Sequence, residues 1–134
     1  MTSNQAVRRS LRILVVDDNV DLALGLAIQM RIQGHEVWTA SDGEAAVEAA
    51  RLHGPDLILM DLGMPRMSGL EAARAIRREL SNVTIVAVSG RSRDEDRAAS
   101  ESAGIDLHVA KPISCEQLVR ILDVVRRRRH EGAH

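Results

Sequence analysis

The sequence predicts an α/β protein: a doubly wound, five-stranded parallel sheet with helices on both faces. Two observations predict this class. Short apolar runs alternate with longer amphipathic segments along almost the whole chain. Four of the five runs are apolar at nearly every position, as strands buried on both faces should be. Because each run is followed by a helical segment, the strands form β–α units and lie parallel.

The five apolar runs are the strand candidates. The second run, Glu36–Ala40, mixes polar and apolar residues and is predicted to be an edge strand. The other four are predicted to be buried on both faces. The strand candidates span residues 13–16, 36–40, 57–60, 83–88 and 107–110.

Start and stop signals place the helices between these strands. The first helix is predicted over residues 21–33, ending before Gly34, a residue favoured just after a helix end. The last carries apolar residues at i, i+3, i+4 and i+7, the spacing of one buried stripe. Each of the four later helices is predicted to begin with a capping box, in which Ser is followed three residues later by Glu or Gln. The boxes are Ser41 with Glu44, Ser68 with Glu71, Ser92 with Glu95, and Ser114 with Gln117.

A chain of 134 residues fits one domain that can bury a core of its own. We expect this domain to cover residues 11–126, with a polar N-terminal extension over residues 1–10. Residues 127–134 are expected to form a loosely ordered polar tail. The arginine run from Arg126 to Arg129 is interpreted as a solvated helix end that complements the helix dipole.

The composition excludes several classes of function. The net charge is −1, so no overall positive field attracts nucleic acid or a membrane surface. Trp38 is the only aromatic residue among Phe, Trp and Tyr, so stacking platforms for single-stranded nucleic acid are absent. Cys115 has no second cysteine to pair with, and no apolar run reaches the length of a membrane span or a signal peptide. We expect a cytoplasmic protein.

Polar residues follow four of the predicted strands. Asp17 and Asp18 follow the first strand, Asp61 the third, Ser89 the fourth and Lys111 the fifth. Lys111 is the one lysine among 18 lysines and arginines. In open α/β sheets, ligands bind beyond the carboxyl ends of the strands. These side chains therefore mark the candidate site.

Three carboxylates would converge there if the first and third strands are neighbours. Asp17, Asp18 and Asp61 would then repel one another, and a divalent cation would relieve that repulsion. A set of hard oxygen ligands selects Mg²⁺ or a similar ion. The alternative is that Asp17 or Asp18 only caps the following helix.

Ser89 and Lys111 indicate the function that such a metal ion would have. A hydroxyl donor and an ammonium group beside a cation form a rim that suits phosphoryl oxygens. Asp61 could then act as a nucleophile, because carboxylates form aspartyl phosphates. Catalysis would rest on position and charge, with Mg²⁺ and Lys111 neutralising the transferring group.

In combination, the motifs at these positions resemble the receiver domain of two-component response regulators. The resemblance covers about residues 11–126. The motifs that carry it are Asp17-Asp18, Asp61-Leu62-Gly63-Met64-Pro65, Ser68-Gly69-Leu70-Glu71, Val88-Ser89-Gly90 and Lys111-Pro112.

The resemblance implies a flavodoxin-like sheet with strand order 2-1-3-4-5 and a role in a phosphorelay. The protein would be a signalling receiver rather than an enzyme acting on a separate substrate, and it would catalyse its own phosphorylation and dephosphorylation. Asp61 would accept phosphate from a sensor histidine kinase or a histidine phosphotransfer protein. The implied roles are Mg²⁺ ligation by Asp17, Asp18, Asp61 and the backbone carbonyl of Gly63, a switch at Ser89, phosphate contact by Lys111, and a cis bond before Pro112.

Two departures from the family pattern leave questions open. His108 stands where the family often has a Tyr or Phe that swings inward on activation. It is either a second switch residue, which could respond to pH, or a histidine with no such role. Gly63 and Arg91 occupy positions that tune hydrolysis of the aspartyl phosphate, so the phosphoryl lifetime stays undetermined.

Three other functions compete with this interpretation. A phosphatase of the haloacid-dehalogenase type needs a second acid two residues after the nucleophile, where this chain has Gly63. An FMN-binding module needs a Ser-, Thr- and Gly-rich loop after the first strand, where this chain has Asp17-Asp18-Asn19. A receiver that works without phosphorylation would not need the complete set of site residues.

We therefore expect a stand-alone receiver that signals through protein contacts. The resemblance implies a signalling face made by the fourth helix, fifth strand and fifth helix, roughly residues 94–128. The downstream protein target is unknown, and weak homodimerisation is possible.

Overall fold

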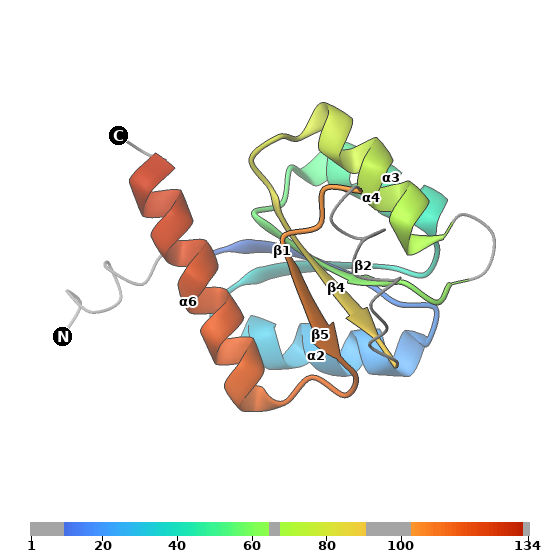
Figure 1. Ribbon diagram of the computed structural model, residues 1–134. Coiled ribbons are helices and arrows are strands. Elements are labelled where there is room, and N and C mark those ends of the chain that lie inside the picture. Colours follow the sequence, from blue (N-terminus) through green and yellow to red (C-terminus); the bar gives the residue numbers. More distant parts are fainter. Residues whose placement is uncertain (1–9, 65–67, 91–102, 133–134) are drawn as a thin grey trace, which may run out of the picture.

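The computed structural model describes residues 10–64, 68–90 and 103–132. Five parallel strands form one sheet in the order β2-β1-β3-β4-β5 (Figure 1), which confirms the predicted fold class and strand order. The edge position predicted for the second strand is also confirmed. The strands are β1 (Arg12–Val16), β2 (Glu36–Ala40), β3 (Leu57–Asp61), β4 (Thr84–Ser89) and β5 (Leu107–Ala110).

Helices cover both faces of the sheet. On one face, α2 (Val20–Ile32) and α6 (Cys115–Gly132) pack against the sheet through one buried cluster. On the other, α3 (Gly43–His53) and α4 (Gly69–Glu79) pack through a second cluster. None of these helices, which are those of the described residues, is long and apolar enough to span a membrane.

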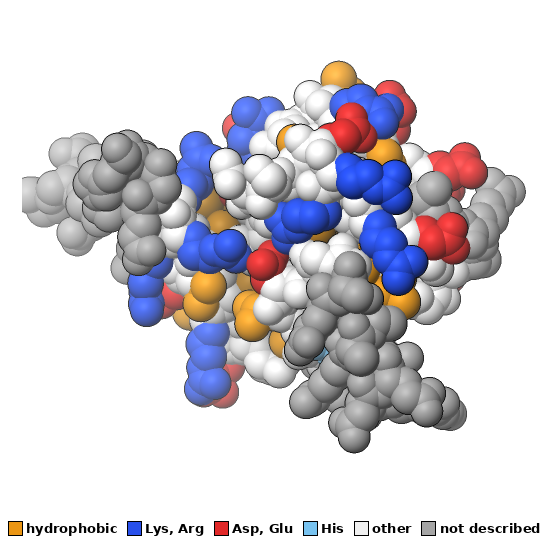
Figure 2. Space-filling view, turned by 45° about the horizontal axis from the view of Figure 1, so that its top comes forward, with side chains coloured by type: hydrophobic (Ala, Val, Ile, Leu, Met, Phe, Trp, Pro, Cys, Tyr) orange, Lys and Arg blue, Asp and Glu red, His pale blue; other side chains and the backbone are white. Residues whose placement is uncertain are grey.

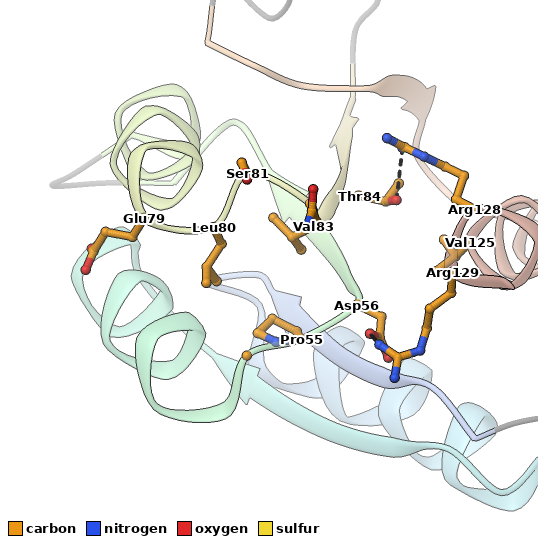
Figure 3. Close-up of a pocket in the computed structure, with 12 residues that line it drawn as sticks. Pro55, Asp56, Glu79, Leu80, Ser81, Val83, Thr84, Val125, Arg128 and Arg129 are labelled. Carbon is orange, nitrogen blue, oxygen red and sulfur yellow. Dashed lines mark hydrogen bonds and ion pairs between the residues drawn. The ribbon is translucent and has the colours of Figure 1, made fainter. Parts of the chain in front are cut away.

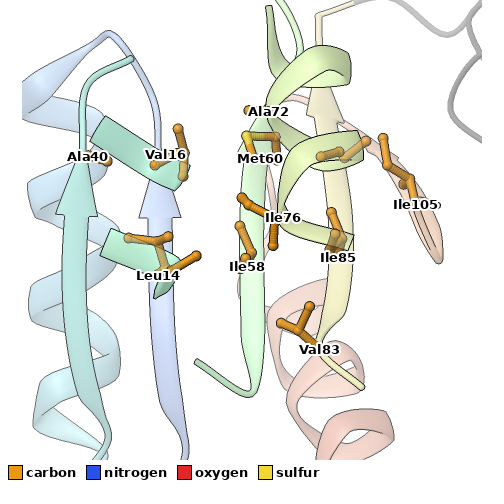
Figure 4. Close-up of a cluster of buried hydrophobic side chains, with 14 of the residues drawn as sticks. Leu14, Val16, Ala40, Ile58, Met60, Ala72, Ile76, Val83, Ile85 and Ile105 are labelled. Carbon is orange, nitrogen blue, oxygen red and sulfur yellow. The ribbon is translucent and has the colours of Figure 1, made fainter. Parts of the chain in front are cut away.

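The two clusters follow from the period-two alternation of side chains along a strand. In β1, Ile13 and Val15 face α2 and α6, while Leu14 and Val16 face α3 and α4. Because both faces are covered, both sets must be apolar, which is why the runs are continuous. Figure 4 shows the second set, where Ile58 and Met60 of β3 lie beside residues of α4. The residues of α4 in this cluster are Ala72, Ala73 and Ile76.

Two of the predicted capping boxes form. The Ser68 hydroxyl accepts from the Glu71 N–H (3.2 Å), and the Ser114 hydroxyl accepts from the Gln117 N–H (3.1 Å). The prediction that Ser41 caps the second helix is wrong. Asp42 is the N-cap of α3, and its carboxylate accepts from the Ala45 N–H at 2.8 Å. Asp is as good a cap as Ser, and the turn places it one residue later. The box of Ser92 with Glu95 lies outside the described residues.

The prediction that the run 107–110 is buried on both faces is wrong. β5 is the second edge of the sheet, and none of its four residues is fully buried. Leu107 keeps 40% of its surface exposed. An apolar run alone does not distinguish an edge strand from a central one, because that depends on how many strands follow in space.

The last helix continues past residue 126, where the domain was expected to end, and reaches Gly132. Arg128 donates to the Thr84 hydroxyl at 3.0 Å, and Arg129 pairs with Asp56 (Figure 3). Residues 128 and 129 are therefore tied to the sheet rather than loosely ordered. These partners lie far away in the sequence, so the arginine run by itself did not reveal them. The domain boundaries themselves stay a prediction.

A groove of about 770 Å³ lies beside these arginines, at the amino ends of the strands. Figure 3 shows Arg128 and Arg129 of α6 on one side and the segments that enter β3 and β4 on the other. The groove is thus at the opposite edge of the sheet from the residues predicted to form the site.

Basic and acidic side chains intermingle on the surface. In Figure 2, Lys and Arg side chains are spread over the displayed face with Asp and Glu side chains among them. Several arginines pair with carboxylates, as Arg51 does with Glu79 (2.9 Å) and Arg77 with Asp106 (2.8 Å). The displayed face therefore presents no field of a single sign.

A buried histidine joins three elements of the fold. His35, which precedes β2, accepts a hydrogen bond from the Leu11 N–H at its Nδ1 atom (3.0 Å). Its Nε2 atom lies 3.3 Å from Nη2 of Arg126 in α6. Burial, and then the charge of Arg126, lower the pKa of His35 below its usual value of 6.5. His35 is therefore neutral in the folded protein near pH 7.

We predict that acid destabilises the fold through His35. Below pH 6.5 the unfolded chain binds a proton that folded His35 rejects, so the free energy of unfolding falls as the pH falls from 6.5 toward the lowered folded pKa. The slope from one such group is at most about 1.4 kcal/mol per pH unit. Urea unfolding of the wild type and His35→Gln between pH 7 and pH 5 measures it. Equal slopes in the two proteins would contradict the prediction.

Candidate functional site

The carboxyl ends of four strands meet at one edge of the sheet and carry polar side chains. Asp61 is the last residue of β3 and Ser89 the last of β4, while Asp17 and Lys111 directly follow β1 and β5. β1 and β3 are neighbours, with Val16 paired to Met60. The first and third strands are therefore neighbours, as the predicted convergence of Asp17 and Asp61 requires.

Three carboxylates cluster at this edge. Asp17, Asp18 and Asp61 each offer an oxygen, and these oxygens lie within 4.8 Å of one another. Asp17 and Asp61 are buried, with only 6% and 5% of their surface exposed, whereas Asp18 is exposed. Two buried carboxylates and a third at the rim leave an acidic pocket that opens toward solvent.

Lys111 is the cation that the structure places in this pocket. Its Nζ atom lies 3.3 Å from Oδ2 of Asp17 and 3.3 Å from Oδ2 of Asp61. Burial lowers the pKa of Lys111, but the carboxylates of Asp61 and then Asp17 raise it by more, so the net pKa is above its ordinary value. Lys111 therefore stays charged and bridges the two acids.

The pKa of Asp61 is raised above its ordinary value. Burial is the largest cause, and the charge of Asp17 adds to it; the Gly63 N–H and Lys111 act in the opposite direction. Burial and the charge of Asp17 thus disfavour the ionised form of Asp61, and additional positive charge near its carboxylate would stabilise that form.

Two hydrogen bonds hold the backbone after Asp61, one to the Asp61 side chain and one to the neighbouring strand β4. The Gly63 N–H donates to Oδ1 of Asp61 at 3.0 Å, and the Leu62 N–H donates to the Val88 carbonyl at 3.2 Å. A Cβ atom at position 63 would lie 3.7 Å from Oδ1 of Asp61. Position 63 therefore borders the carboxylate directly, and glycine leaves that side open.

Gly69 positions Asp61, and sequence reasoning did not identify this role. A Cβ atom at position 69 would lie 2.3 Å from the carbonyl oxygen of Asp61 and 2.9 Å from Cα of Leu62. Only glycine permits the first turn of α4 to sit so close to the end of β3. The Ser68 cap signalled where α4 begins, but the contact itself appears only once the helix is packed on the sheet.

Asn19 is a second residue that sequence reasoning missed. It is the N-cap of α2, and its side chain accepts from the Leu22 N–H at 3.2 Å. Its own N–H donates to Oδ1 of Asp17 at 2.9 Å. The alternative that Asp17 or Asp18 caps the helix is therefore wrong, because Asn19 does so.

Ser89 and His108 lie next to each other beside this pocket. Oγ of Ser89 is 3.4 Å from Nε2 of His108, and the Lys111 N–H donates to the Ser89 carbonyl at 2.8 Å. The peptide bond between Lys111 and Pro112 is cis. Arg91, which the sequence singled out, lies outside the described residues.

The donor set fits a hard divalent cation. Asp17, Asp18 and Asp61 supply only carboxylate oxygens, the ligand type that Mg²⁺ prefers. Burial, and then the charge of Asp17, raise the pKa of Asp61, and a bound cation would favour its ionised, ligating form. These residues could hold such an ion; the part assigned to the Gly63 carbonyl stays a prediction.

Comparison with known proteins identifies the family. The profile described as response regulator receiver domain matches residues 13–123. The chain belongs to this family. The haloacid-dehalogenase and FMN-binding alternatives are thereby set aside.

Curated relatives of this receiver domain include regulators of mycobacteria. It is 37% identical over 116 residues to the probable transcriptional regulatory protein TcrX of Mycobacterium tuberculosis, covering 87% of this chain and 50% of TcrX. It is 38% identical over 124 residues to the transcriptional regulatory protein PrrA of the same organism, covering 92% of this chain and 53% of PrrA. The receiver domain thus spans about half the length of these relatives.

Solved structures share the fold of this receiver domain. The chemotaxis protein CheY4 of Vibrio cholerae superposes with a TM-score of 0.82 at 27% identity, covering 87% of this chain and 99% of that one. A CheY-like receiver domain of Methanospirillum hungatei superposes with a TM-score of 0.86 at 24% identity, covering 92% and 100%.

Proposed function

We propose that the protein accepts a phosphoryl group on Asp61 in a Mg²⁺-dependent phosphorelay in the cytoplasm. The donor would be a sensor histidine kinase or a histidine phosphotransfer protein. One observation carries the proposal: the buried Asp61 carboxylate lies 3.3 Å from Lys111 and shares a pocket with Asp17 and Asp18. A nucleophile, a cation and a metal-ligand set in one pocket suit phosphoryl transfer.

In this proposal an ionised oxygen of Asp61 attacks the phosphorus of a phosphohistidine. An O–P bond forms as the N–P bond breaks, and the electron pair of that bond returns to the imidazole nitrogen. Mg²⁺, held by Asp17, Asp18, Asp61 and the Gly63 carbonyl, would supply positive charge to the carboxylates and the phosphoryl oxygens. Gly63 leaves one side of the carboxylate open for the approach of the donor.

Lys111 and Ser89 would contact the phosphoryl group after transfer. Lys111 already stands 3.3 Å from Asp61, so its ammonium needs only a small movement to meet a phosphoryl oxygen. A slender, single point charge fits a crevice crowded by carboxylates better than the broad fork of arginine.

The signal would pass through Ser89 and His108. If Ser89 turns its hydroxyl toward the phosphoryl group, its 3.4 Å contact with His108 is lost and the imidazole becomes free to rotate. His108 belongs to β5, part of the signalling face predicted over residues 94–128; residues 94–102 of that stretch lie outside the described residues. We propose that the output of this receiver domain is a protein contact at this face, and that the domain itself binds neither nucleic acid nor a membrane.

Incubation with acetyl phosphate and Mg²⁺, read by intact mass, tests the proposal. We expect the wild type to gain the mass of one phosphoryl group, because a small donor needs only the pocket itself. Asp61→Ala should gain none, and EDTA should prevent the gain in the wild type. Fluoroberyllate binding to the wild type alone would give independent support. An unmodified wild type, or an equal adduct on Asp61→Ala, would refute the proposal.

A further inference from the structure

Two hydrogen-bond donors face the two nitrogen atoms of the His35 ring. The Leu11 N–H donates to Nδ1 at 3.0 Å, and Nη2 of Arg126 lies 3.3 Å from Nε2. A histidine ring does not accept at both nitrogens near neutral pH, because at least one of them carries a proton. One of these two contacts is therefore a contact between two donors.

The burial of Leu11 decides which nitrogen of His35 carries the proton. Leu11 is 0% exposed, and a buried backbone N–H almost always has an acceptor. Nδ1 therefore accepts from Leu11, and the proton of the neutral ring is on Nε2. This Nε2–H faces Nη2 of Arg126, which can only donate. His35 is only 5% exposed, and among the described residues no group other than Arg126 lies at hydrogen-bond distance from Nε2.

Arg126 has a second donor without an acceptor. Its Nε atom is buried and has no hydrogen-bond partner in the described part of the chain. Nε and Nη2 belong to the same edge of the guanidinium, where parallel N–H bonds form the fork that binds anions. This fork and the Nε2–H of His35 bring three donors together, and no acceptor from the described residues faces them.

The positive charge at these donors is only partly balanced. Asp123 of α6 lies 3.6 Å from Nη1 of Arg126, on the atom that is not part of the fork. Asp123 also pairs with Arg127 at 4.0 Å, and its side chain is 53% exposed. One exposed carboxylate is thus shared between two arginines. A charged acceptor is therefore favoured over a neutral one at the fork, because hydrogen bonds between ionised partners are the stronger ones.

We propose that the fork of Arg126 and the Nε2–H of His35 bind a small monovalent anion of the size of chloride. Nη2 and Nε2 are 3.3 Å apart, so one acceptor about 3 Å from each atom serves both donors. The Arg126 side chain is 29% exposed, which gives the anion access from solvent, while the burial of His35 limits its size. The anion ties α6 to the residues that precede β1 and β2. This site does not use the carboxylate pocket, so it stands independently of the phosphorylation proposal.

Thermal melts at constant ionic strength and neutral pH test the site. Sodium gluconate, whose anion is too large for a site beside a buried histidine, is replaced stepwise by sodium chloride. At about ten times the Kd, chloride should raise the melting temperature by about 5 °C, because it binds only the folded state. Arg126→Met should show no rise, whereas Arg127→Met, at a neighbouring arginine that is 76% exposed, is the matched control and should keep it. A wild type that does not respond to chloride, or a rise that Arg126→Met retains, would overturn the proposal; a water molecule or another part of the chain would then supply the acceptor.

Nitrogen NMR of the histidine rings tests the site in the wild type, without relying on a variant that must fold. Proton–nitrogen correlation spectra at neutral pH should show His35 protonated at Nε2, its signals being assigned by their loss in His35→Gln. Chloride should shift the Nε2 resonance of His35 and leave that of His53, which stacks on Trp38, unchanged. A proton on Nδ1, or an Nε2 resonance that chloride does not move, would exclude the site. Arg126→Met should still form the phosphoryl adduct, so that the two proposals fail separately.

Discussion

Replacing Gly69 by alanine is expected to destabilise the protein by about 3 kcal/mol and to prevent phosphorylation of Asp61. The added Cβ atom would lie 2.3 Å from the Asp61 carbonyl oxygen and 2.9 Å from Cα of Leu62. Both are backbone atoms, so no side-chain rotation relieves the overlap. The first turn of α4 or the end of β3 must move, and Asp61 moves with it. Urea unfolding measures the loss of stability, and intact mass after acetyl phosphate treatment measures the loss of the adduct.

Gly25→Ala is the matched control for this experiment. It makes the same chemical change inside a helix, but its Cβ atom would meet nothing within 4 Å. Its expected effect is a gain of about 1 kcal/mol in the free energy of unfolding, measured where the protein is monomeric. If Gly69→Ala were as stable and as readily phosphorylated as the wild type, the close approach of α4 to Asp61 would not position the phosphoacceptor.

Replacing Lys111 by methionine is expected to make the protein depend on Mg²⁺ for its stability. Lys111 bridges Asp17 and Asp61 at 3.3 Å each, and without it the two buried carboxylates face each other uncompensated. Because the pair is partly exposed, the loss should be about 2 kcal/mol, less than for a fully buried pair. The same change should tighten Mg²⁺ binding about tenfold or more, since a unit charge at this distance contributes about 1–4 kcal/mol. Thermal melts in EDTA and in Mg²⁺, with a Mg²⁺ titration, measure both effects.

Lys111→Arg conserves the charge and is the control. Its stability in EDTA and its Mg²⁺ affinity should stay close to those of the wild type. Since the guanidinium is broader and planar, it should weaken signalling to the partner more than it weakens phosphorylation. A Lys111→Met protein that is as stable in EDTA as the wild type, with unchanged Mg²⁺ affinity, would show that Lys111 does not balance the carboxylates.

The strand and helix pattern could be predicted from the sequence because it follows local rules. The continuous apolar run of β3 identifies a strand covered on both faces, and the boxes at Ser68 and Ser114 identify helix starts. The candidate site was predictable for a similar reason. Parallel strands end at a common edge, so Asp17 after β1 and Asp61 at the end of β3 had to converge once those strands were neighbours.

Other features depend on contacts between distant segments. The Ser41 pattern predicted a cap that Asp42 forms instead, because the geometry of the turn selects between two suitable residues. β5 proved to be an edge strand, although its residues are apolar. The arginines at the end of α6 were expected to be solvated, yet Arg128 and Arg129 bind Thr84 and Asp56. Each outcome depends on which residues meet in space, and this cannot be predicted from periodicity along the chain.

The sequence by itself determined the fold class, the strand order through the family resemblance, and the edge of the sheet where acidic and basic groups gather. The tertiary structure alone decided how closely those groups lie: the bridge of Lys111 between Asp17 and Asp61, and the approach of Gly69 to the Asp61 carbonyl. The physical reason is one of range. Hydrophobic periodicity and capping act over a few residues, whereas electrostatic balance and close packing act through space between residues that the chain keeps far apart.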